Sequence, residues 1–117
     1  MYKVIIAGGR EFSDYEYLRS CADADLAGIT DDIEIVSGGA SGADALGERY
    51  AKEKGRTVAL FPADWNRYGR SAGPRRNRQM AEYADALIAF WDGQSRGTKN
   101  MIDTATAKGL KVSVHNY

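Results

Sequence analysis

The sequence predicts a Rossmann-like α/β fold in three layers, with a five-stranded, mostly parallel sheet and about four helices. Three observations predict this fold. Short runs of apolar, often β-branched residues alternate along the 117-residue chain with segments whose apolar residues recur at helical spacing. The apolar runs are nearly continuous, which is typical of strands covered on both faces. Each helical segment stands between two such runs, as right-handed parallel crossovers require.

The first half of the chain contains three of the expected strands, at residues 3–7, 33–36 and 57–61. The sequence from Ser13 to Glu16 reads as a capping box and predicts a helix that continues to about Ala27. An apolar stripe predicts a second helix, which begins at Ala43 and ends near Gly55.

The second half of the chain begins with the least regular segment, a loop over residues 63–72. A proline in the first turn predicts the helix that follows, from Gly73 and Pro74 to about Tyr83. The remaining elements are expected as a strand, a helix and a last strand at residues 86–91, 97–108 and 110–114. Because ligands of such sheets bind beyond the carboxyl ends of the strands, the loops at those ends are the candidate site.

Length and composition limit the possible functions. The length predicts a single domain over residues 1–117 with one core. Sixteen basic and sixteen acidic residues give a net charge of zero, which argues against a protein that coats nucleic acid. No apolar run approaches the roughly 20 residues of a membrane span and no signal peptide precedes the first strand, so we expect a cytoplasmic protein without a membrane partner. Because Cys21 and His115 are the only residues of their types, we expect no intramolecular disulfide and no His-rich metal site. We also expect no bound metal and no cofactor.

The segment from Ser37 to Asp44 is the strongest candidate for a binding site. It joins a predicted strand to a predicted helix and contains three glycines and two serines. Glycines allow positive φ and close approach to a ligand, while the free N–H groups of a helix start attract anions. A plain tight turn seldom needs so many of these residues together. We therefore predict phosphate binding by Ser37, Gly38, Gly39, Ser41 and Gly42, and we expect Asp44 to bind a ribose hydroxyl or cap the helix.

Two further turns follow predicted strands. Gly8, Gly9 and Arg10 either cover a nucleotide from the first strand or form a plain turn with a surface arginine. Gly97 and Thr98 begin the last helix, where Thr98 is expected to be the cap and the first N–H groups offer a second anion site. Neither the G-x-G-x-x-G spacing nor a Gly-Lys-Ser/Thr motif occurs, which argues against classical NAD redox chemistry and P-loop hydrolysis.

Arginines and aromatic residues concentrate in the loop and in the start of the third long helix. The arginines are Arg67, Arg70, Arg75, Arg76 and Arg78. Their mutual repulsion favours either a bound polyphosphate, with Arg75 and Arg76 as the expected contacts, or a basic surface that touches another subunit. Trp65 and Tyr68 either stack a base or hold the loop against the core.

Taken in order, these motifs resemble the SLOG superfamily over nearly the whole chain. The matching segments are residues 8–12, residues 37–44, and residues 73–80 followed by residues 84–90. The superfamily joins the DprA proteins, the LOG phosphoribohydrolases and the YspA/YpsA-like domains, and the chain looks most similar to the last group. The resemblance implies a pocket for a nucleotide or a nucleotide derivative, often proposed to be ADP-ribose-like. It also implies a homo-oligomer.

The LOG enzymes allow a comparison of catalytic residues. They cleave an N-glycosidic bond with an arginine, which Arg76 matches, and with a glutamate just after a Gly-Thr turn. In this sequence Asn100 and Met101 occupy the positions expected for that acid. Neither can stabilise the positive charge that develops on the sugar. If the protein is an enzyme, Arg76 and a less conventional carboxylate remain, of which Asp103, Asp92 and Asp44 are the candidates.

The leading hypothesis is therefore a protein without catalytic residues that binds a phosphorylated nucleoside, with ADP-ribose and related signals as the favoured class. It would act as a sensor or would sequester the signal. The first alternative is an N-glycosidase or phosphoribohydrolase that acts on nucleoside monophosphates. A weaker alternative, by analogy with DprA, is single-stranded DNA binding through the arginine-rich loop.

Overall fold

The computed structural model describes all residues from 1 to 117 and contains one five-stranded sheet. The strands are β1 (Tyr2–Gly8), β2 (Ile33–Ser37), β3 (Thr57–Leu60), β4 (Ala86–Trp91) and β5 (Lys111–Asn116). Their order in the sheet is β3-β2-β1-β4-β5, and all four neighbouring pairs are parallel. The predicted five-stranded sheet is confirmed, and it is parallel throughout.

Four long helices connect the strands, as the sequence predicts. They are α1 (Tyr15–Leu26), α2 (Ala43–Glu53), α4 (Ala72–Tyr83) and α5 (Arg96–Ala107). The loop that we expected to be irregular contains a short helix, α3 (Trp65–Tyr68), and a single 3-10 turn at Gly69–Ser71. The carboxylate of Asp64 begins α3 by accepting a hydrogen bond from the N–H of Arg67 at 3.1 Å.

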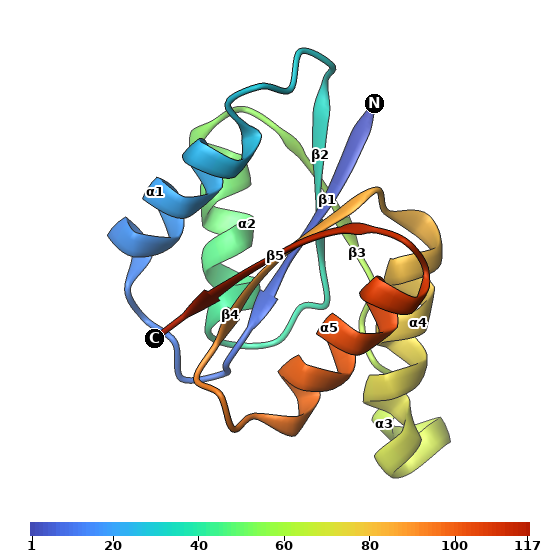
Figure 1. Cartoon of the computed structure of the whole chain (residues 1–117). Helices are drawn as coiled ribbons and strands as arrows, with labels where there is room; N and C mark the ends of the chain where they lie inside the picture. The colour runs from blue at the N-terminus through green and yellow to red at the C-terminus, as the bar shows by residue number, and fades with distance from the viewer.

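The helices form a layer on each face of the sheet (Figure 1): α1 and α2 cover one face, and α4 and α5 cover the other. Alternate residues of β1 supply the two cores, because successive side chains of a strand point to opposite faces. Val4 and Ile6 pack with residues of α1 and α2, whereas Ile5 and Ala7 pack with residues of α4 and α5. The predicted three-layer arrangement is therefore confirmed.

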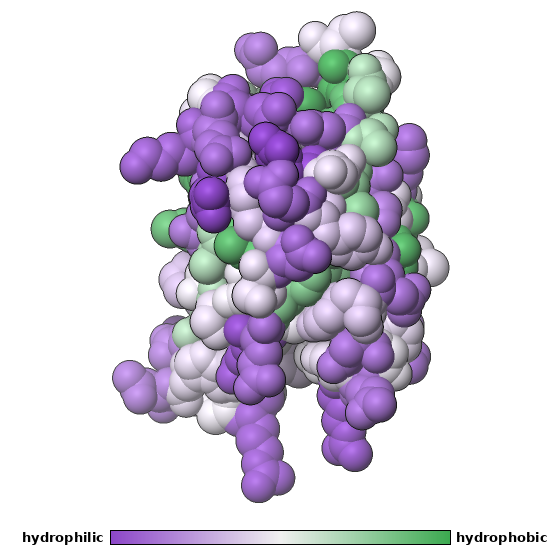
Figure 2. Space-filling view, turned by 90° about the vertical axis from the view of Figure 1, so that its left-hand side faces the viewer, coloured by the Kyte–Doolittle hydropathy of each residue, from purple (hydrophilic) through white to green (hydrophobic).

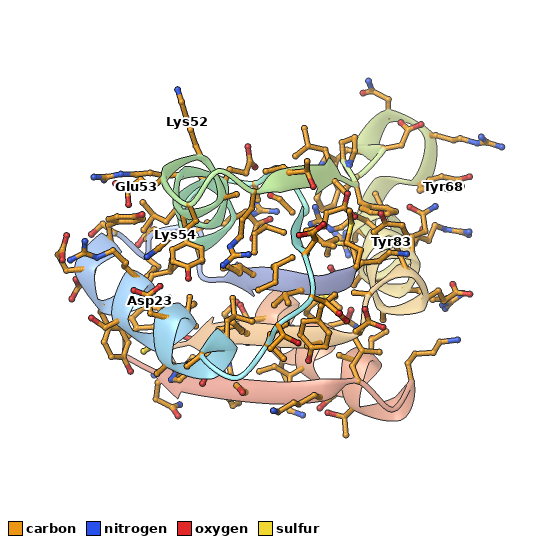
Figure 3. All side chains as sticks on the ribbon, turned by 90° about the horizontal axis from the view of Figure 1, so that it is seen from above. Asp23, Lys52, Glu53, Lys54, Tyr68 and Tyr83 are labelled. Carbon is orange, nitrogen blue, oxygen red and sulfur yellow. The ribbon has the colours of Figure 1, made fainter.

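Polar contacts also join α1 to α2 on the outer side of their layer. Asp23 on α1 accepts a hydrogen bond from the Tyr50 hydroxyl at 2.6 Å and forms an ion pair with Lys54 at 3.2 Å. Figure 3 shows Asp23 on α1 and Lys54 at the end of α2. The Tyr50 ring is almost completely buried beneath this contact, so the two helices are held together by an apolar ring with a polar end.

Two helix starts differ from the sequence prediction. Asp14, rather than Ser13, caps α1, and its carboxylate accepts a hydrogen bond from the N–H of Tyr17 at 3.1 Å. Ser95, rather than Thr98, caps α5, and its hydroxyl accepts a hydrogen bond from the N–H of Thr98 at 3.4 Å. Asp and Ser are both favoured caps, so the sequence places each helix start to within a few residues and does not select the capping side chain.

The strand order creates a switch point between β1 and β4. The chain winds outward from β1 to β3 on one side and then returns to β4 on the other side. The crossovers from β1 and β4 therefore diverge, and a crevice is expected between them at the carboxyl ends of the strands. In Figure 1 these ends lie toward the bottom of the molecule. None of the helices has the length and apolar character needed to cross a bilayer.

Candidate functional site

A cavity of about 790 Å³ opens at the switch point, within the range of small-molecule sites. Its walls come from the segments after β1, β2 and β4, from the start of α4 and from the last residue of the chain. Figure 2 shows hydrophilic side chains projecting from the lower end of the molecule, where these segments lie. Of the residues predicted for the site, Gly8, Gly9, Arg10, Asp44, Trp65, Arg76, Gly97 and Thr98 line the cavity.

The two glycines after β1 are required by close neighbours in the wall. A Cβ atom on Gly8 would overlap the carbonyl oxygen of Phe90 on β4. A Cβ atom on Gly9 would overlap the hydroxyl of Tyr117. These residues therefore allow the first strand to approach β4 and the last residue of the chain, which places the Arg10 side chain at the cavity.

The glycine-rich turn after β2 has the backbone shape that the sequence predicts, with φ of +73° at Gly39 and +74° at Gly42. Two of its N–H groups, however, donate to acceptors within the protein. The N–H of Gly39 donates to the Ser37 hydroxyl at 3.1 Å, and that of Ala40 donates to the Asp44 carboxylate at 3.2 Å. Ser37, Gly38, Gly39, Ser41 and Gly42 do not line the cavity. Direct contact between this turn and a phosphate therefore remains a prediction. The Asp44 carboxylate is an anion that already accepts a hydrogen bond from this turn.

The serines of this turn have internal partners. The Ser37 side chain is fully buried, and its hydroxyl donates to the Glu48 carboxylate at 2.7 Å. The Ser41 hydroxyl donates to the carbonyl oxygen of Arg10 at 3.2 Å. A Cβ atom on Gly42 would lie 2.5 Å from that same oxygen. The turn is thus fastened to the β1 loop, and it holds one wall of the cavity in place.

Asp44 is the buried carboxylate of the cavity, with only 5% of its surface exposed. Burial raises the pKa of Asp44 because the ionised form loses water. The hydrogen bond from Ala40 and the positive charge of Arg76 oppose this increase in pKa. A carboxyl group in such a setting can accept hydrogen bonds from ligand hydroxyls, and it can also exchange a proton.

Arg76 lies beside Asp44 and is held in position by two hydrogen bonds. Its Nη1 donates to the carbonyl oxygen of Gly38 at 2.6 Å, and its Nε donates to the Asn77 side chain at 3.1 Å. Burial lowers the pKa of Arg76, the charge of Asp44 raises it, and the charge of Arg10 lowers it. The guanidinium group therefore joins the β2 turn to α4 at the wall of the cavity.

The start of α5 forms the opposite part of the wall, where Ser95, Arg96, Gly97 and Thr98 line the cavity. The first N–H groups of a helix have no partner within the helix, and they carry partial positive charge. The Asp92 carboxylate orders the turn before this helix by accepting hydrogen bonds from the N–H groups of Gln94 and Ser95, each at 2.8 Å. These bonds, with that of Ser95 the larger, lower the pKa of Asp92. Asp92 is thus a turn residue at the cavity rather than a free carboxylate.

Four arginines line the cavity, and none of them has an acidic partner within 4.0 Å: Arg10, Arg70, Arg76 and Arg96. Glu11, Asp44 and Asp92 are the acidic residues of the same wall. Unpaired guanidinium groups that face one hollow repel one another, and an anion between them relieves this repulsion.

Other predicted residues lie outside the cavity. The guanidinium of Arg75 stacks on the Tyr68 ring at 4.3 Å, and its Nε donates to the Ser71 hydroxyl at 3.1 Å. Tyr68 also stacks with the guanidinium of Arg67 at 5.0 Å, and none of these residues lines the cavity. Asp103 forms an ion pair with Lys99 at 2.9 Å on the exposed side of α5. Of the two aromatic residues predicted to stack a base, only Trp65 borders the cavity.

Two lining residues, Asn77 and Tyr117, were not singled out by the sequence reasoning. Asn77 connects α4 to α5, because its Nδ2 donates to the Asn100 side chain at 2.9 Å. Asn77 stands next to Arg76 in the arginine-rich motif, which was the available signal. Tyr117 also lines the cavity. No local pattern marks it, because β5 brings it to the site through the tertiary fold.

The fold and the site define a Rossmann-like α/β protein with a ligand-sized cavity at its topological switch point. Comparisons with known proteins agree with this description. Residues 2–68 match the sequence profile of the YspA, cpYpsA-related SLOG family. The chain is 33% identical over 118 residues to the Gene 61 protein of Mycobacterium phage D29, covering 96% of this chain and 94% of that protein. The chain belongs to the YspA, cpYpsA-related SLOG family.

The fold also resembles a solved structure. The X-ray structure of TM1055, a target of the Northeast Structural Genomics Consortium, matches 96% of this chain and 72% of that chain. The TM-score is 0.68 and the sequence identity is 22%. At this identity the likeness concerns the fold, and it supports the sheet and helix arrangement described above.

Proposed function

We propose that the protein binds a phosphorylated nucleoside or a nucleotide-derived signal of the ADP-ribose type, without converting it. Its role in this proposal is that of a sensor, or of a protein that sequesters the signal. The observation that carries the proposal is the set of four unpaired arginines around one cavity in a chain of zero net charge. Membership of the SLOG family supports a nucleotide-related ligand.

The phosphate is assigned to the part of the cavity between Arg76 and the start of α5. The unpaired guanidinium groups line the same cavity as Gly97 and its neighbours at the start of α5. A Cβ atom on Gly97 would meet nothing within 4 Å, so open space adjoins the helix start. Guanidinium groups and helix N-termini both bind phosphate oxygens, and they act on the same charge here.

The sugar is assigned to Asp44, since this carboxylate borders the cavity beside Arg76. A buried carboxylate accepts hydrogen bonds from hydroxyl groups, and a ribose presents two neighbouring ones. Asp44 is the buried acidic residue of the wall, and the N–H of Ala40 holds its carboxylate in place.

Binding without turnover is favoured by the residues at the positions where LOG enzymes carry their acid. Asn100 occupies one such position, and its side chain is engaged with Asn77. Asp103 forms its ion pair on an exposed surface and does not line the cavity. Neither residue provides a carboxylate next to the sugar.

A second candidate function is N-glycosidase activity, which Asp44 specifically favours. A buried carboxyl group with a raised pKa beside an arginine is a common arrangement at catalytic sites. In this alternative Asp44 stabilises the positive charge on the sugar while Arg76 holds the phosphate.

Calorimetry with ADP-ribose and with nucleoside monophosphates, followed by chromatography of each mixture, tests both candidates. We expect binding with one ligand per chain and no released base. Arg76→Ala should weaken binding strongly, whereas Arg78→Ala, an exposed position on the same helix, should leave it unchanged. Release of free base that is lost in Asp44→Asn would establish the glycosidase instead. If neither ADP-ribose nor nucleoside phosphates bind, the proposal is refuted.

A further inference from the structure

We propose that the ligand is a dinucleotide, with one aromatic base at each end and phosphates between them. This inference rests on the proposed function and specifies the class of ligand. It starts from two aromatic side chains, Trp65 and Tyr117, which line the same cavity and remain 49% and 48% exposed. Among the large apolar residues that are exposed in this protein, only these two border the cavity.

The two rings reach the cavity from opposite edges of the sheet. Trp65 begins the short helix after β3, and Tyr117 follows β5 directly. These strands are the outer strands of the sheet, four strand spacings apart, or about 19 Å at the usual spacing between strands. Figure 1 shows α3 and the C-terminus on different sides of the molecule. Because the two rings belong to segments that follow the two outer strands, we expect a single base stacked on one ring to leave the other ring uncovered.

Arg10 lies close to both aromatic residues. Its neighbour Gly9 lies against the Tyr117 hydroxyl, while its own guanidinium reaches to 5.8 Å from the centre of the Trp65 ring. The Arg10 side chain thus runs from one aromatic residue toward the other. Arg76 and Arg96 line the same cavity, so positive charge and two aromatic surfaces border one space. This combination matches two bases that are joined by a phosphate bridge.

Each ring is also seated on a glycine of the wall, so its position is fixed. The Cη2 atom of Trp65 lies 3.3 Å from the place where Gly73 would carry a Cβ atom. A Cβ atom on Gly9 would overlap the Tyr117 hydroxyl. Tyr117 additionally packs on Phe12, with 4.6 Å between ring centres, and its N–H donates to the carbonyl oxygen of Trp91 at 3.2 Å.

These contacts hold both rings half-exposed instead of burying them in the core. A ring held in this way loses little conformational entropy when a base stacks on it. Stacking of one base on one aromatic side chain changes affinity by roughly 5- to 150-fold. A ligand that uses both rings should therefore gain that factor over a ligand that uses one.

Calorimetry with ADP, ADP-ribose and diadenosine diphosphate provides the test. We expect the dinucleotide to bind about 5- to 150-fold more tightly than ADP. Trp65→Leu and Tyr117→Leu should each reduce dinucleotide affinity by a factor in this range. Only one of the two variants should also lower the affinity for ADP, because ADP has a single base. The control Tyr68→Leu removes an aromatic residue of the same short helix that does not line the cavity, and it should leave all affinities unchanged.

A spectroscopic measurement keeps the test independent of the stability of the variants. Trp65 and Trp91 are the only tryptophans, so Trp91→Phe leaves a single reporter in the cavity. Its fluorescence should be quenched when the dinucleotide is added. Equal affinity for ADP and the dinucleotide, or a Tyr117→Leu variant that binds the dinucleotide normally, would overturn the dinucleotide and leave the proposed nucleotide site intact. Absence of binding by all three compounds would overturn both.

Discussion

Replacing Gly38 by alanine tests the position of Arg76 without altering Arg76 itself. Gly38 is buried and does not adopt a positive φ, so its backbone conformation accepts alanine. The new Cβ atom would overlap Nη1 of Arg76 and lie 2.8 Å from the Oδ2 atom of Asp44. Because Nη1 is the end of a flexible side chain, we expect the guanidinium group to move while the backbone stays in place.

The size of the effect follows from the bonds that are lost. Arg76 can no longer donate to the carbonyl oxygen of Gly38, a contact of 2.6 Å. A buried carbonyl without its partner costs about 1–3 kcal/mol, which should appear in the free energy of unfolding. A lost hydrogen bond between the charged guanidinium and a phosphate costs about 1.5–3 kcal/mol, or roughly 10- to 150-fold in Kd.

Urea denaturation and calorimetry with ADP-ribose measure these two quantities. Gly28→Ala is the matched control, because Gly28 is exposed and a Cβ atom there would meet nothing within 4 Å. The control should bind normally and lose no stability. A Gly38→Ala protein that is folded and binds as tightly as the wild type would refute the role assigned to Arg76.

Two further predictions concern the stability of the protein. Burial raises the pKa of Asp44 above its ordinary value of 3.8, so its contribution to stability is fully present below that pH and is lost as the pH rises through the higher folded-state pKa. Asp44→Asn should therefore gain stability relative to the wild type between pH 4 and pH 7 in urea denaturation, and an equal difference at both pH values would contradict the assigned pKa shift. Asp14→Ala should lower the free energy of unfolding by about 1 kcal/mol, because it removes the cap of α1. Ser13→Ala should change it by less than about half as much, and the reverse order would restore Ser13 as the cap.

The sequence predicts the fold well because the fold depends on periodicity and on the order of elements. The alternation of Val4, Ile5, Ile6 and Ala7 between two cores follows directly from an apolar strand in a covered sheet. The cap of α1 and the helix in the loop over residues 63–72 depend on single side chains, such as Asp14 and Asp64. Several residues near each start satisfy the same preference, so sequence alone does not decide between them.

The site is predicted less completely because its parts meet only in the folded chain. The sequence identifies Gly9, Arg10 and Arg76, which stand in recognisable motifs and line the cavity. It does not reveal that Asp44 accepts the N–H of Ala40, since a glycine-rich turn looks the same whether its N–H groups bind the protein or a ligand. It also gives no sign of Tyr117, whose place depends on the register between β4 and β5.

The Asp44 carboxylate has a consequence for the kinetics of binding. The carboxylate accepts a hydrogen bond from the N–H of Ala40, so we expect the turn after β2 to have its ligand-bound shape in the free protein. A preorganised site does not spend affinity on ordering a loop, and its backbone moves little when it is filled. Variants of the cavity should therefore capture their ligand at similar rates, and they should differ chiefly in how long they retain it.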